Sequence, residues 1–108
     1  MEEKDVVVAL AALAQSARLR VFRALVVAGP QGMTPSGLAE TLAVPSSTLS
    51  FHLKELMHAG LISQQRDGRS LIYRAAIDRM NGLMSYLSAN CCLGVDCTAE
   101  ATPACTTC

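Results

Sequence analysis

The sequence predicts a mainly α-helical domain of about five helices with one small two-stranded β-hairpin. Apolar side chains recur every three or four positions along most of the chain, which is the period of an amphipathic helix. Residues 61–75 differ, because they form two short extended runs around an Asp-Gly pair. Hydrophobic residues make up 51% of the 108 residues and only four side chains are aromatic, so we expect an aliphatic core.

Two helices are expected at the start of the chain, over residues 3–15 and 17–28. Ser16 is the predicted N-cap of the second helix, and Gly29 and Pro30 should end it. The predicted buried face of the first helix is Val6, Val7, Leu10, Leu13 and Ala14. That of the second helix is Leu19, Phe22, Leu25 and Val26. The second helix also has three arginines that could contact phosphate but are more simply solvated, namely Arg18, Arg20 and Arg23.

A pair of short helices is expected over residues 34–60. Thr34 is the predicted N-cap of the first helix, Ser46 or Ser47 that of the second, and Gly60 should form the C-terminal cap. The predicted buried positions are Leu38, Ala39 and Leu42 in the first helix and Leu49, Leu53, Leu56 and Met57 in the second.

The opposite face of the second helix of this pair has small hydroxyl side chains near its N-terminus, followed by an aromatic ring and a cation. Such side chains can contact bases or phosphates when a helix enters the major groove of DNA. A capped helical hairpin with a solvated polar face explains the same residues, because such hairpins are common. The candidate DNA-contacting residues here are Ser46, Ser47, Thr48, Ser50, Phe51 and Lys54.

A β-hairpin is expected to follow at once, with strands over residues 61–65 and 70–75. The Asp-Gly pair between these runs is typical of a tight hairpin turn. Arg66 and Arg69 flank the turn, so they can reach phosphates or an adjacent minor groove while the helix occupies the major groove. A helix-turn-helix followed by a basic hairpin is much more specific than either part, and it predicts a winged helix-turn-helix domain that binds DNA.

The distribution of charge agrees with a nucleic-acid partner, although the formal net charge is zero. Residues 17–79 carry eight basic and four acidic side chains, whereas both ends of the chain are acidic. An enzyme is not expected, because the sequence has no phosphate-binding loop, no paired carboxylates with a pocket signature and no cysteine near a histidine. No apolar run approaches the roughly 18 residues that cross a bilayer, and the acidic start is unlike a secretory signal. We therefore expect a cytoplasmic protein without a membrane partner.

A last helix is expected over residues 78–90, with Asp78 as its N-cap. Its apolar stripe is Met80, Leu83, Met84 and Leu87, with Tyr86 beside it. Too little chain remains to cover this stripe, and the first helix has the same surplus. We therefore expect the two terminal helices to pack against each other and against a second copy, which would present two recognition helices to half-sites roughly 34 Å apart. The alternative is that both helices only close the core of a monomer.

All five cysteines lie after residue 90, and they favour a thiolate site for a soft ion over a set of disulfides. Cys91, Cys92 and Cys97 fall within seven residues, which suits a site of three sulfurs. Zinc ranks second, because zinc cages usually pair two short-spaced couples of ligands. Adventitious binding by a flexible tail is a further alternative. Two more cysteines could add ligands, namely Cys105 and Cys108.

Only two histidines occur, and neither has a cysteine nearby. His52 is expected to be packed and hydrogen-bonded within the second helix of the pair. His58 lies near the predicted C-terminus of that helix, where a cation is favoured. Neither is expected to be a metal ligand.

The chain resembles the arsenical-resistance repressor family (the ArsR type), whose small winged-helix members dimerise and release operator DNA on binding a metal or metalloid ion. The resemblance covers about residues 5–90, and the run SSTLSFHLKELMHAGLI followed by RDGRSLIYR is similar to the family's recognition helix and hairpin. The founding arsenic sensors have cysteines on the first helix of the DNA-binding pair, but residues 34–43 contain none. The zinc-type Asp and His site of the last helix is also missing, since residues 79–90 contain no His.

A smaller branch of this family carries adjacent cysteines just beyond the last helix and a third several residues on, a pattern that Cys91, Cys92 and Cys97 fit. The resemblance therefore implies a homodimeric repressor in which residues 1–90 dimerise and bind operator DNA, and residues 91–108 bind arsenite or antimonite as the effector. No cofactor is required. Two alternatives stay open: a repressor of the same fold that responds to zinc, cadmium or an organoarsenical, and a thiol redox sensor whose cysteines form disulfides.

Overall fold

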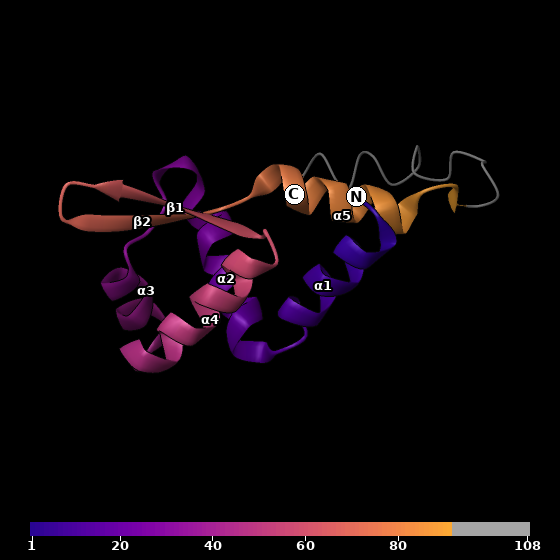
Figure 1. Ribbon diagram of the computed structural model, residues 1–108. Coiled ribbons are helices and arrows are strands. Elements are labelled where there is room, and N and C mark those ends of the chain that lie inside the picture. Colours follow the sequence, from indigo (N-terminus) through magenta and orange to yellow (C-terminus); the bar gives the residue numbers. More distant parts are fainter. Residues whose placement is uncertain (92–108) are drawn as a thin grey trace.

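The computed structural model describes residues 1–91, which form five α-helices, a short 3-10 turn and one β-hairpin. Figure 1 shows the hairpin reaching out beyond α3, while α1 and α5 lie together at the opposite end of the molecule. The structure thus confirms a mainly helical domain with a two-stranded wing. The helices are α1 (Glu3–Leu13), α2 (Ser16–Ala28), α3 (Pro35–Leu42), α4 (Ser46–His58) and α5 (Ile77–Ser88); η1 is Gly29–Gln31, and the strands are β1 (Ile62–Asp67) and β2 (Ser70–Ala75).

The turn between α3 and α4 confirms one predicted cap and corrects another. Thr34 is the N-cap of α3, because its Oγ1 accepts a hydrogen bond from the backbone N–H of Gly37 at 3.1 Å. The N-cap of α4 is Pro45, without a side-chain hydrogen bond, so the prediction of Ser46 or Ser47 as the cap is wrong. Both serines lie inside the first turn of α4, where they are exposed.

The end of α4 is a Schellman motif, in which a glycine in the left-handed region closes the helix. Gly60 has φ +75°, its N–H donates to the carbonyl of Met57 at 3.0 Å, and the N–H of Leu61 donates to the carbonyl of Leu56 at 3.0 Å. The predicted role of Gly60 is confirmed. Because the motif turns the chain sharply, β1 begins directly after it.

Two other predicted N-caps lie one or two residues away from the observed ones. Gln15, rather than Ser16, caps α2, since its longer side chain reaches the backbone N–H of Arg18 at 2.9 Å. Ala76 occupies the N-cap position of α5, and Asp78 lies in the first turn. Asp78 still suits that position, because a carboxylate is favoured near the positive end of the helix dipole.

The wing is joined to the helices by a third extended segment. Asp67 pairs with Ser70 at the tip, which leaves a two-residue turn in which Gly68 has φ +65°. Along its other edge, β2 forms a bridge in which Met33 and Tyr73 exchange backbone hydrogen bonds of 2.9 and 2.8 Å. The wing is therefore anchored to the connection between α2 and α3.

Some of the helical faces that form the core differ from those predicted from the sequence. Leu19 and Met57 are exposed rather than buried, and Val21 is completely buried. In α1 the inner face is made of Val6, Ala9 and Ala12. Small residues on this face let α1 approach α2 and α4 closely. The largest fully buried side chains are Leu25, Leu38, Leu49, Leu56, Leu61 and Val21.

Candidate nucleic-acid interface

The outer face of α4 consists of polar side chains held by a buried inner face. Leu49, Leu53 and Leu56 are at most 3% exposed and pack α4 against α1, α2 and α3. Phe51 is 55% exposed, and it is the one large apolar side chain on the polar side of the helix's first two turns. All six candidate residues of this helix are exposed, namely Ser46, Ser47, Thr48, Ser50, Phe51 and Lys54.

The wing has two exposed cations. Arg69 lies in the two-residue turn, and Arg66 lies within β1, opposite Leu71, because the strand is longer than predicted. The two ion pairs found in residues 1–91 involve other residues, so neither wing arginine nor Lys54 is paired with a carboxylate there. These three cations are therefore available to phosphate.

A groove of about 350 Å³ separates the first turn of α3 from the wing. On one wall it has the hydroxyl-bearing residues Thr34 and Ser36, and on the other Arg69 and Ser70. Sequence analysis did not assign Ser36 or Ser70 to the interface. The signal that could have identified them is the hydroxyl-rich start of α3, but the proximity of the wing to this helix depends on tertiary structure.

The side chain of Arg74 joins the wing to the segment after α2 through hydrogen bonds. Its Nε donates to the carbonyl of Pro30 at 2.6 Å, and its Nη1 donates to Oε1 of Gln65 at 2.6 Å. Close packing at Gly32 supports the same junction, because a Cβ there would lie 2.6 Å from the carbonyl oxygen of Tyr73. The wing is thus held at two points relative to α3 and α4.

His52 lies on the inner side of α4 and is 5% exposed. Its Nδ1 is buried and has no hydrogen-bond partner in the described part of the chain, so the predicted hydrogen bond at that nitrogen is not observed. Burial, and secondarily the nearby charge of Arg18, lower the pKa of His52 from its ordinary value. Arg18 itself is half-buried, since its Nε donates to the carbonyl of Ala12 at 2.8 Å, whereas Arg20 and Arg23 are exposed as expected.

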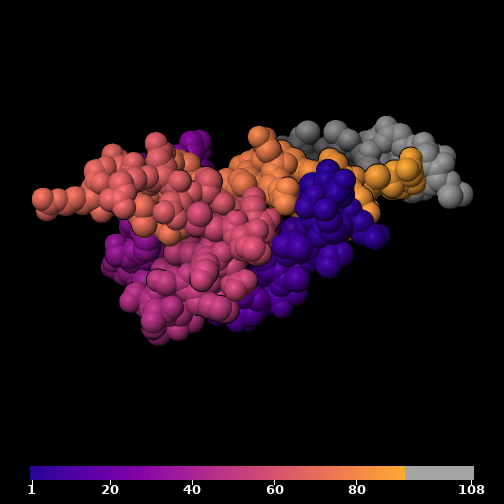
Figure 2. Space-filling view, viewed as in Figure 1, coloured from indigo at the N-terminus to yellow at the C-terminus, as the bar shows by residue number. Residues whose placement is uncertain are grey.

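The apolar surplus of the terminal helices lies on the surface. Figure 2 shows α1 and α5 in contact at one end of the molecule, opposite the projecting wing. Met84 is 63% exposed and Leu87 59% exposed, so these two residues of the apolar stripe of α5 lie on the surface. The exposed large apolar side chains of these two helices are Val7, Val8, Leu10, Ile77, Met84, Tyr86 and Leu87.

The candidate metalloid ligands begin just beyond α5. Cys91 is half-buried and follows the last residue of α5, Ser88, by three positions. The other predicted ligands lie outside the described residues, namely Cys92, Cys97, Cys105 and Cys108. Within residues 1–91 there is no group of three or more His, Cys, Asp or Glu side chains that could hold a metal ion. No helix in the same part of the chain is long and apolar enough to span a membrane.

Known proteins share both the motif and the fold. A family model described as a helix-turn-helix domain matches residues 13–65. An ArsR-like transcriptional regulator from Rhodococcus sp. RHA1 is 24% identical, with 93% of this chain and 89% of that chain covered and a TM-score of 0.73. The homodimeric winged helix-turn-helix DNA-binding domain Mb0332 from Mycobacterium bovis, a possible ArsR-family transcriptional regulator, is 25% identical, with 81% of each chain covered and a TM-score of 0.63.

A third solved structure is that of a possible transcriptional regulator for arsenical resistance, which is 29% identical over 74% of this chain and 80% of that chain, with a TM-score of 0.64. A search of curated proteins found no match. The helix-turn-helix match, the wing and the similarity to these structures together show that the chain has the fold of a winged helix-turn-helix transcriptional regulator and is similar to regulators of the ArsR family, which are not enzymes.

Proposed function

We propose that this regulator is a homodimeric repressor that binds operator DNA and is released from it when trivalent arsenic or antimony binds its C-terminal cysteines. The observation that carries the DNA-binding part is the exposed hydroxyl face of α4 together with the exposed arginines of the wing, which form no ion pair within residues 1–91. Ser47, Thr48 and Ser50 would contact bases or phosphates in the major groove. Arg66 and Arg69 would contact phosphates or the adjacent minor groove.

Dimerisation is supported by the uncovered apolar side chains of α1 and α5, and the similar protein Mb0332 is described as homodimeric. A second copy would cover Met84 and Leu87, which are the most exposed large apolar residues of α5. It would also supply a second copy of α4, and a pair of recognition helices reads two half-sites where one helix reads few base pairs.

The effector part rests on the cysteines and on similarity to a possible regulator for arsenical resistance. Cys91 lies three positions beyond the helix that carries the exposed apolar stripe. An ion bound by Cys91, Cys92 and Cys97 would therefore act next to the dimer helices, with Cys105 and Cys108 as further candidate ligands. Such an ion can release DNA only if it binds the DNA-incompetent arrangement more tightly. Proton release should accompany its binding, because thiols must ionise to become ligands.

The DNA-binding part is tested with a duplex selected from a random-sequence pool by the wild-type protein. Arg69→Ala should weaken binding and reduce the slope of log K against log salt by about 1, because one phosphate contact is lost. Arg23→Ala is the matched control, since it removes an exposed arginine from α2. If Arg69→Ala kept the wild-type affinity and salt slope, the wing would not contact DNA.

The effector part is tested by titrating the complex of protein and selected duplex with arsenite, antimonite, a monomethyl trivalent arsenical, zinc and cadmium under reducing conditions. A separate titration without reductant uses peroxide. Cys97→Ser should bind the duplex normally but lose its release by arsenite, while Cys105→Ser serves as the matched control. Normal release of Cys97→Ser by arsenite would refute the three-sulfur site, and retained release by a monomethyl trivalent arsenical would indicate a two-thiol site. Release by zinc, cadmium or peroxide, but not by arsenite, would identify one of the alternative sensors.

A further inference from the structure

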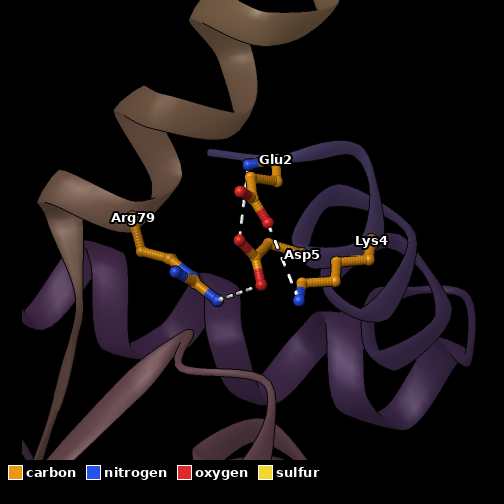
Figure 3. Close-up of polar contacts among 4 residues, drawn as sticks. All are labelled: Glu2, Lys4, Asp5 and Arg79. Carbon is orange, nitrogen blue, oxygen red and sulfur yellow. Dashed lines mark hydrogen bonds and ion pairs between the residues drawn. The ribbon is translucent and has the colours of Figure 1, made fainter.

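The guanidinium of Arg79 lies where three helices meet. Figure 3 shows this side chain reaching from α5 towards Asp5 of α1, and its Nη2 lies 3.9 Å from Oδ1 of that carboxylate. It also lies against the end of α4, because a Cβ on Gly60 would be 3.2 Å from Nε and 3.3 Å from Cζ of Arg79. One side chain of α5 therefore contacts both α1 and the recognition helix.

Both surfaces that Arg79 contacts are held by local hydrogen bonds. Asp5 uses its second oxygen, Oδ2, to accept a hydrogen bond from the backbone N–H of Glu2 at 3.3 Å, as part of the capping box of α1. Gly60 belongs to the Schellman motif of α4, where the helix dipole places partial negative charge that favours a nearby cation. Arg79 thus bridges the first turn of α1 and the last turn of α4.

These contacts are better suited to positioning than to stabilisation. An ion pair at 3.9 Å between side chains that are 34% and 36% exposed contributes little to stability. Moreover, the Nε of Arg79 is buried and has no hydrogen-bond partner in residues 1–91, which costs free energy. What remains is the packing of the planar guanidinium against Gly60, which is a close contact between α5 and the turn that ends α4.

We propose that Arg79 is a positioning residue that sets the end of α4 relative to the dimer helices α1 and α5. This inference rests on the proposed function, in which α4 reads DNA. Because α4 is a single rigid helix, a shift at Gly60 changes the direction of its outer face, and in a dimer it also changes the separation of the two copies. A displacement of α5, including one caused at Cys91, would be passed to the end of α4 through this side chain as well as through α1.

The test compares Arg79→Lys with Arg20→Lys on two DNA probes, the duplex selected by the wild type and a random-sequence duplex of the same length. Both variants keep the charge, and Arg20 is an exposed residue of α2 outside the interface. Arg79→Lys should bind the selected duplex about tenfold more weakly, because a misdirected helix loses base contacts. It should bind the random duplex as the wild type does and keep the wild-type melting temperature. Arg20→Lys should resemble the wild type on both probes.

If Arg79→Lys bound the selected duplex within twofold of the wild type, the proposal would be wrong. Equal losses on both probes together with a lower melting temperature would also overturn it, because they indicate a purely structural role. A wild type that selects no duplex would instead refute the proposed function itself. Double-mutant analysis checks the contact: Gly60→Ala should lower the melting temperature less in the Arg79→Ala background than alone, since the Cβ then no longer meets the guanidinium. Equal shifts in both backgrounds would exclude the contact.

Discussion

Replacing Gly32 with alanine should displace the wing from the helical core. Gly32 has φ +68° and ψ −171°, a backbone conformation that is almost restricted to glycine. It also lies directly against β2, because an added Cβ would be 2.6 Å from the Tyr73 carbonyl oxygen, 2.7 Å from Ile72 Cγ2 and 2.9 Å from Arg74 Cγ. Three atoms of the wing, one of them in the backbone, would have to move.

The magnitude follows from two separate costs. Alanine in this backbone conformation costs about 1–3 kcal/mol, and forcing extra volume into a packed site typically costs about 1–3 kcal/mol more. Gly29→Ala is a matched control, since Gly29 has φ +69° and ψ −150° but nothing within 4 Å of an added Cβ. We therefore expect a loss of about 4 kcal/mol for Gly32→Ala and about 2 kcal/mol for Gly29→Ala.

Urea unfolding of both variants at one protein concentration measures these losses as changes in the free energy of unfolding. In the same samples, Gly32→Ala should bind the selected DNA duplex more weakly than Gly29→Ala, because only the former moves Arg69 relative to α4. If the two variants were equally destabilised, the close approach at Gly32 would have no energetic consequence, and its contribution to anchoring the wing would be refuted.

Three further predictions concern other parts of the fold. Thr34→Ala should lower the free energy of unfolding in urea by about 1 kcal/mol, since the N–H of Gly37 loses its acceptor, whereas Thr34→Ser should be nearly neutral. Burial first and Arg18 second lower the pKa of His52, so the unfolded chain takes up a proton more readily. The stability that neutral His52 contributes should therefore be fully present above about pH 6.5 and be lost as the pH falls from there towards the folded-state pKa. In urea unfolding at pH 7.5 and 5.5, His52→Leu should show a smaller decrease in the free energy of unfolding than the wild type. Leu87→Glu should give a monomer in sedimentation measurements, and a dimer of unchanged affinity would contradict the role of α5.

Features that depend on neighbouring residues were predicted correctly from the sequence. The cap at Thr34, the left-handed end of α4 at Gly60 and a tight hairpin turn, which the structure places at Gly68 and Arg69, all involve hydrogen bonds or dihedral preferences within a few positions. The exposed face of α4 was also predicted, because its polar and apolar residues separate cleanly at the helical period. The N-caps of α2, α4 and α5 were less predictable, since several adjacent residues can fill that position.

The orientation of the more uniformly apolar helices could not be predicted in the same way. In α1 the period allows two overlapping faces, and the structure buries Val6 and Ala9 while Val7 and Leu10 stay exposed. The sequence contained no reason to prefer the face with smaller side chains. That choice depends on how closely α1 approaches its neighbours, which is a property of the packed molecule.

The sequence by itself determined the class of the fold, the order of its elements and the exposed residues of α4, because these follow from local periodicity and turn chemistry. Only the tertiary structure decided where the wing lies relative to the helices and how α5 packs at the end of α4. Arg74 donates a hydrogen bond to the carbonyl of Pro30, which lies 44 positions away in the sequence. Gly60 packs against Arg79, although the two strands of the wing separate them in the sequence. Such contacts leave no periodic pattern, because each depends on the geometry of several packed elements at once.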